Sequence, residues 1–197
     1  MSFDYHMMIP PMALPSFDEM TPAQARVHFD WFTQQSGVRI DQLKRAYAHE
    51  VVSPSDLDES RDSLVPLWRW LARHAKERPL SQEEAEQRRS QLPQWVLEAG
   101  VTAGELSSPS LALAVDAGFY LARIFLKAYP DKVSWTLWER SGDQYYNRPV
   151  LVGFGAAPLL PHELLINAMW GVVHGRMDEN RLAKIYDVWA RKLERQE

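Results

Sequence analysis

Residues 110–130 read SLALAVDAGFYLARIFLKAYP, a stretch that is apolar on nearly every side. The chain continues with VSWTLWER at 133–140, a polar turn, RPVLVGFG at 148–155 and PHELLINAMWGVV at 161–173. This order predicts a buried helix, a two-stranded hairpin and a second apolar helix that pack together, because a hairpin alone is only marginally stable. We therefore expect a mainly α (α+β) protein, with a helical body of about six or seven helices and a small antiparallel β-hairpin.

The 197 residues fit one domain. Pro10, Pro11 and Pro15 prevent a regular helix at the start, but the surrounding side chains are apolar enough to lie across the body. Thr21-Pro22 predicts a helix start, and Gly37 predicts its end. The expected division of the single domain 1–197 is an extended Pro-rich arm at 1–20, N-terminal helices at 21–77, a polar helix and linker at 78–107, and a helix–hairpin–helix–helix core at 108–197.

Composition narrows the function classes. The chain has no cysteine and a net charge of −4, and basic residues dominate no long face, so nucleic acid is not an expected partner. The longest apolar run is interrupted by charge before it reaches about 18 residues, which disfavours a membrane span. The N-terminus lacks a basic region and is broken by prolines, so a signal peptide is not expected and the predicted location is cytoplasmic.

No catalytic motif is present in the sequence. None of the serines lies in GxSxG, the glycines form no phosphate-binding loop, and no histidine pair has HExxH spacing. The sequence thus predicts no catalytic, cofactor-binding or metal-binding residues and no cofactor. Carboxylates that meet only on folding leave no motif, so these absences argue against an enzyme without deciding the matter.

Two sets of residues are candidates for binding. Asp116, Tyr120, Arg123 and Lys127 are spaced 4, 3 and 4 apart along the predicted helix. Such a line is typical of a solvated stripe, and in the alternative Asp116 and Arg123 form a buried pair facing a cleft that includes His162. The second set lies in the predicted turn, where Tyr145, Tyr146, Asn147 and Arg148 combine residue types common at protein interfaces. In the alternative, the tyrosines fold back on the helices.

Three strings resemble a family of small uncharacterised bacterial cytosolic proteins: IPPMALPSFDEMTPAQARVHFDWF at 9–32, PVLVGFG at 149–155 and NRLAKIYDVWARKL at 180–193. By analogy, compact acidic proteins without cysteine are similar to the immunity proteins of bacterial toxin systems. The resemblance implies a protein-binding module that masks a basic, toxin-like partner by contact. The alternatives are a small-molecule binder or enzyme with a cleft near Asp116, Arg123 and His162, and a structural homodimer.

Overall fold

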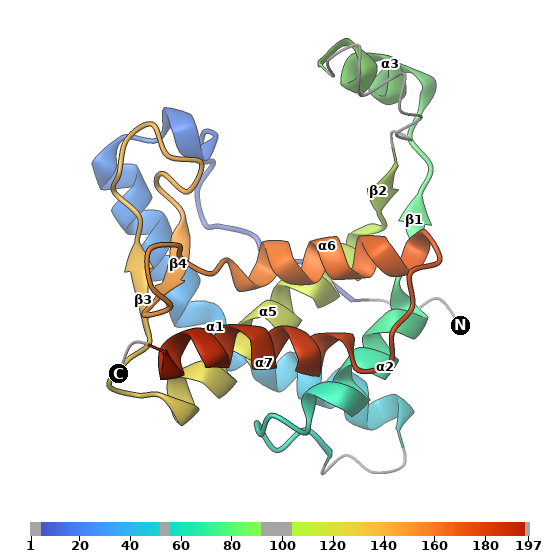
Figure 1. Ribbon diagram of the computed structural model, residues 1–197. Coiled ribbons are helices and arrows are strands. Elements are labelled where there is room, and N and C mark those ends of the chain that lie inside the picture. The colour runs from blue at the N-terminus through green and yellow to red at the C-terminus, as the bar shows by residue number, and fades with distance from the viewer. Residues whose placement is uncertain (1–4, 52–55, 92–103, 196–197) are drawn as a thin grey trace.

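The computed structural model describes residues 5–51, 56–91 and 104–195 (Figure 1). The described residues form a mainly helical body with two small antiparallel sheets, which confirms the predicted fold class. The elements in chain order are η1 (Phe17–Glu19), α1 (Pro22–Glu50), α2 (Leu64–His74), β1 (Glu77–Arg78), α3 (Gln82–Gln91), β2 (Glu105–Leu106), α5 (Ser108–Ala128), β3 (Ser134–Leu137), β4 (Pro149–Val152), α6 (Pro161–Val173) and α7 (Arg181–Glu194).

Helix α1 begins where the sequence predicts. Thr21 accepts a hydrogen bond from the backbone N–H of Gln24, and the Gln24 side chain bonds the Thr21 N–H in return. The predicted helix end at Gly37 is wrong, because α1 has 29 residues and continues through Gly37 to Glu50. A glycine in a helix costs only about 1 kcal/mol relative to alanine. The buried residues on both sides of Gly37 outweigh that cost.

Helix α5 is the centre of the body and packs against α1, α2 and α6. Small residues allow the close packing: a Cβ on Gly118 would lie 2.9 Å from the backbone of His162 in α6. The expected solvated stripe on this helix is wrong in its first half, since Asp116 and Tyr120 are fully buried. Lys127 is exposed at the end of the helix.

Strands β3 and β4 form the predicted hairpin, with Trp135 paired to Leu151 and Leu137 paired to Pro149. Pro149 begins its strand, a position that proline tolerates. The hairpin packs on α1, and Leu151 and Leu159 exchange two backbone hydrogen bonds that lead the chain toward α6.

The second sheet was not predicted from the sequence. Strands β1 and β2 pair Arg78 with Glu105, within the segment 78–107 that we expected to be a polar helix and linker. The ribbon leads from the body to α3, which stands away from the other helices (Figure 1). Ser81 and Glu84 make the reciprocal bonds of a capping box at the start of α3.

The main hydrophobic core is a continuous cluster from Tyr5 in the arm to Leu193 in α7, with Trp68 and Trp70 among its fully buried side chains. Within the described part of the chain, no helix combines the length and apolar character that crossing a membrane requires.

Candidate functional site

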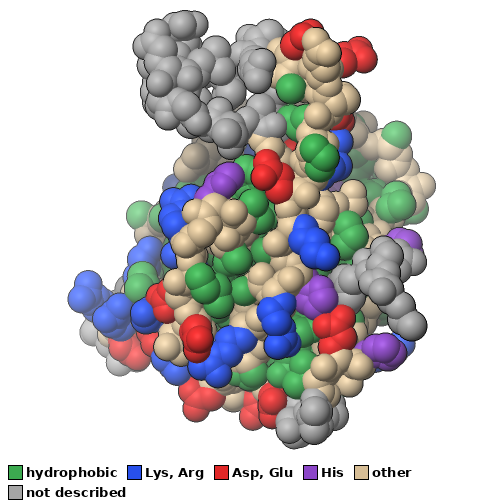
Figure 2. Space-filling model, turned by 90° about the vertical axis from the view of Figure 1, so that its right-hand side faces the viewer, with side chains coloured by type: hydrophobic (Ala, Val, Ile, Leu, Met, Phe, Trp, Pro, Cys, Tyr) green, Lys and Arg blue, Asp and Glu red, His purple; other side chains and the backbone are tan. Residues whose placement is uncertain are grey.

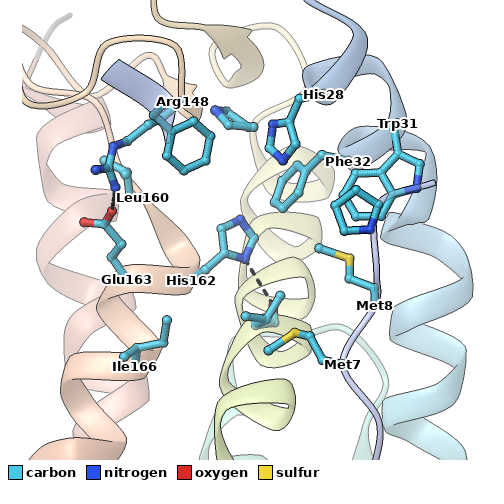
Figure 3. A pocket seen from close by; sticks show the side chains of 14 residues that line it. Met7, Met8, His28, Trp31, Phe32, Arg148, Leu160, His162, Glu163 and Ile166 are labelled. Atoms are coloured by element: carbon cyan, nitrogen blue, oxygen red, sulfur yellow. Dashed lines mark hydrogen bonds and ion pairs between the residues drawn. The ribbon is translucent and has the colours of Figure 1, made fainter. Parts of the chain in front are cut away.

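A pocket of about 330 Å³ lies between the N-terminal arm, α1, α5, the start of β4 and the start of α6 (Figure 3). Most of its wall is apolar, built from methionine and proline of the arm, aromatic side chains of η1 and α1, and aliphatic side chains of α5 and α6. Four lining residues can carry charge: His28, Arg148, His162 and Glu163. Ligand pockets in proteins have this character, with an apolar wall and a few polar groups.

His162 is held rigidly in the pocket wall. Its Nδ1–H donates a 3.1 Å hydrogen bond to the backbone carbonyl of Val115. The imidazole stacks on Trp135 with an interplanar angle of 6° and meets the Phe32 ring edge-on at 4.7 Å. Gly118 lies against the ring on a further side, where a Cβ would come within 2.6 Å of Nδ1. These contacts define one orientation for the imidazole.

Burial lowers the pKa of His162 to about 4, against a smaller raising effect of the Val115 carbonyl. The imidazole is therefore neutral at pH 7. A carbonyl oxygen can only accept, so the single proton is on Nδ1 and Nε2 carries a lone pair. Nε2 is closed off from solvent and has no hydrogen-bond partner among the described residues, although the side chain as a whole is only half-buried.

A second neutral imidazole lies in the same wall. His28 in α1 is 9% exposed, and burial lowers its pKa. Its ring is surrounded by Phe17, Trp31 and Phe32 at centroid distances of 5.3, 5.7 and 5.8 Å. Its Nδ1 is also buried, and no described residue forms a hydrogen bond with it. The residue is thus buried, but this nitrogen is not satisfied within the described part of the chain.

Arg148 and Glu163 form an ion pair at the side of the pocket opposite Trp31 (Figure 3). The guanidinium also lies 4.9 Å from the centre of the Phe17 ring. The Nε of Arg148 is buried, with no hydrogen-bond partner in the part of the chain that the structure describes. The two opposite charges cancel, so the lining side chains carry no net charge at pH 7.

The residues of the predicted cleft do not line one pocket. Of the three, only His162 lines the pocket. Asp116 accepts a 2.7 Å bond from Arg39 Nε in α1 and another from the hydroxyl of Tyr5. Burial raises the pKa of Asp116, while the bonds from Arg39 and Tyr5 oppose that rise. Arg123 is half-buried, seven residues further along α5.

The four residues of the predicted partner-binding turn are divided between two environments. Tyr145 and Tyr146 are half-buried, and Tyr145 meets Trp138 edge-on at 6.0 Å. Asn147 is 2% exposed and donates to the carbonyls of Phe17 and Met20 at 2.9 and 3.0 Å. Asn147 and Arg148 therefore contact the N-terminal arm, and partner binding by this turn stays a prediction.

Sequence reasoning missed Arg39, whose side chain is 8% exposed. A signal for it was present: His28, Phe32, Arg39 and Leu43 are spaced 4, 7 and 4 apart, so Arg39 occupies an apolar-face position of α1. An arginine on such a stripe requires a buried acidic partner.

Comparisons of this chain with protein-family models, curated proteins and solved structures give no match. Among residues 5–51, 56–91 and 104–195, no three His, Asp or Glu side chains come together as metal ligands would. The chemistry of the pocket is thus the basis for assigning a function.

Proposed function

We propose that this chain is a small-molecule-binding protein and that its ligand occupies the pocket between the arm, α1, α5 and α6. The observation that carries the proposal is a pair of neutral imidazoles, His28 and His162, that line one apolar pocket. Each has one buried nitrogen with no hydrogen-bond partner among the described residues. A buried polar atom without a partner costs about 1–3 kcal/mol, which a ligand or an ordered water recovers.

The size of the pocket supports the same function. Its volume of about 330 Å³ is within the range of small-molecule sites in proteins. The arm contributes Met7, Met8 and Pro10 to the wall, so a ligand is enclosed by a segment that packs over the body from outside it. Methionine side chains adapt to ligands of different shape because they are unbranched and polarizable.

The hypothesis that the protein masks a basic, toxin-like partner has less support. On the face shown in Figure 2, acidic and basic side chains are intermixed and do not form an acidic surface that would steer a basic partner. Two of the four turn residues contact the arm, which reduces the surface that the turn offers to a partner. The immunity-like function and the homodimer both stay predictions.

A titration with the neutral two-ring fluorophore 6-propionyl-2-(dimethylamino)naphthalene tests the proposal, because its emission rises and shifts to shorter wavelength in an apolar site. We expect saturable binding to the wild type. Ile166 lines the pocket from α6, so Ile166→Trp fills the cavity and should weaken binding at least about tenfold. The control is Val38→Trp, which puts the same side chain on an exposed position of α1. Absence of binding to the wild type, or equal binding to Ile166→Trp, would overturn the proposal.

A further inference from the structure

The hydrogen-bonding pattern of His162 limits what the ligand can be. Its Nδ1–H donates a hydrogen bond to the Val115 carbonyl, so Nε2 carries the lone pair and can only accept. The ring is confined by Gly118 on one side and stacks on Trp135, so a ring flip that would put carbon atoms in the places of the two nitrogens is blocked. Only a group with a hydrogen to donate can satisfy Nε2.

The charges of the pocket limit the ligand further. Burial lowers the pKa of both His28 and His162, so neither imidazole is positive at pH 7. Arg148 is already paired with Glu163. An ion that enters such a site loses its hydration without gaining an unpaired countercharge, and the cost is large. An uncharged ligand avoids it.

The volume and the lining of the pocket favour an aromatic molecule. A cavity of about 150 Å³ holds one benzene, and this pocket has about twice that volume. The walls offer the rings of Phe17, Trp31 and Phe32 for stacked or edge-on contact. Two fused rings match both the volume and the walls.

We propose that the ligand is an uncharged molecule of about two aromatic rings whose hydroxyl or N–H group donates a hydrogen bond to Nε2 of His162. This inference rests on the proposed function and names the class of ligand for the same pocket. Nε2 is closed off from solvent in the structure, so the proposal requires that side chains around it shift when the ligand enters. Met7 and Met8 of the arm also line the pocket, and their unbranched side chains can adapt to a bound ligand.

Calorimetric titration with three naphthalene probes tests the ligand class at pH 7.5. 2-Naphthol has the donor, 2-methoxynaphthalene has a similar shape without it, and 2-naphthoate is an anion. We expect 2-naphthol to bind about tenfold more tightly than 2-methoxynaphthalene, the effect of one buried hydrogen bond, and 2-naphthoate to bind more weakly than either. This comparison needs no variant and is independent of any effect on folding.

A variant then assigns the preference to one atom. His162→Asn retains an amide N–H that can reach the Val115 carbonyl but has no counterpart of Nε2, so the preference for 2-naphthol should fall to about twofold or less. The control is His174→Asn, the same exchange at an exposed position after the end of α6, which should retain the tenfold preference.

The possible outcomes separate the two proposals. If no probe binds the wild type, the small-molecule function fails and the ligand class fails with it. If 2-naphthol and 2-methoxynaphthalene bind with equal affinity, the pocket is a binding site but the role of His162 is wrong. Tightest binding of 2-naphthoate would instead show that Arg148 receives an anion and would overturn the uncharged class.

Discussion

His162 combines a cost to the stability of the fold with the proposed role in ligand binding. It is the second residue of α6, where the positive end of the helix dipole disfavours a further positive charge. Burial acts in the same direction and lowers its pKa to about 4. The folded protein therefore keeps this imidazole neutral at a pH where the unfolded chain would protonate it.

Protonation of His162 should make stability depend on pH. The unfolded imidazole titrates near 6.5 and the folded one near 4, so the unfolded state binds more protons between these values. The neutral imidazole therefore contributes fully to the free energy of unfolding above pH 6.5. As the pH falls toward 4, the free energy of unfolding decreases by up to about 3 kcal/mol. The difference in unfolding free energy between wild type and His162→Asn, from urea titrations at pH 7.5 and pH 4.5, should shrink by that order. A difference independent of pH would contradict it.

The helices and strands differ in how well the sequence predicts them. The apolar runs of α5 and α6 and the alternation of Val133, Trp135 and Leu137 predict the core because burial sets these patterns. The predicted helix end at Gly37 is wrong because a glycine destabilises a helix by less than the packing on both sides of it stabilises the helix. Strands β1 and β2 have two residues each, which is too short for a period of two to appear.

A few polar contacts bind the N-terminal arm to the body of the protein. Asn147 has a positive φ of 61° and donates to two arm carbonyls. Asparagine tolerates this conformation better than most residues, so Asn147→Asp tests the bonds with little effect on the backbone. A carboxylate is repelled by the two carbonyl oxygens, so the end of the arm should be released. Chymotrypsin should then cleave the arm, on the N-terminal side of Met20, about tenfold faster than in the wild type.

Mass spectrometry of the timed digests measures this effect. Asn180→Asp is the control, since it makes the same exchange at an exposed residue before α7. A ligand bound in the pocket should slow cleavage in the wild type, because Phe17 of the arm lines the pocket. If Asn147→Asp is cut at the wild-type rate, the arm does not depend on these two bonds.

At the scale of the whole molecule, distant parts of the chain meet in ways that no local pattern records. The pocket combines the arm, α1, α5, β4 and α6, so a sequence can mark His162 as a candidate but cannot bring His28 and Arg148 beside it. The polar line on α5 was visible, but the partner of Asp116 proved to be Arg39, 77 residues earlier in the chain. Which residues of two helices face each other is decided by packing of the complete body.

Tyr5, Arg39 and Asp116 join the arm, α1 and α5 in one buried network, and Arg39 also donates to the His6 carbonyl at 2.7 Å. Removing one charge leaves the other buried without its partner. Arg39→Met and Asp116→Leu should therefore each lower the unfolding free energy by about 3–5 kcal/mol.

Removing the whole network should cost much less than removing one member, because apolar side chains of similar volume need no partners. The triple variant Tyr5→Phe, Arg39→Met, Asp116→Leu should lie within about 1–2 kcal/mol of the wild type in urea unfolding. That result would mean the network specifies how the arm docks and adds little net stability. A triple variant as unstable as the worse single variant would show that the three polar groups stabilise the fold through interactions that packing cannot replace.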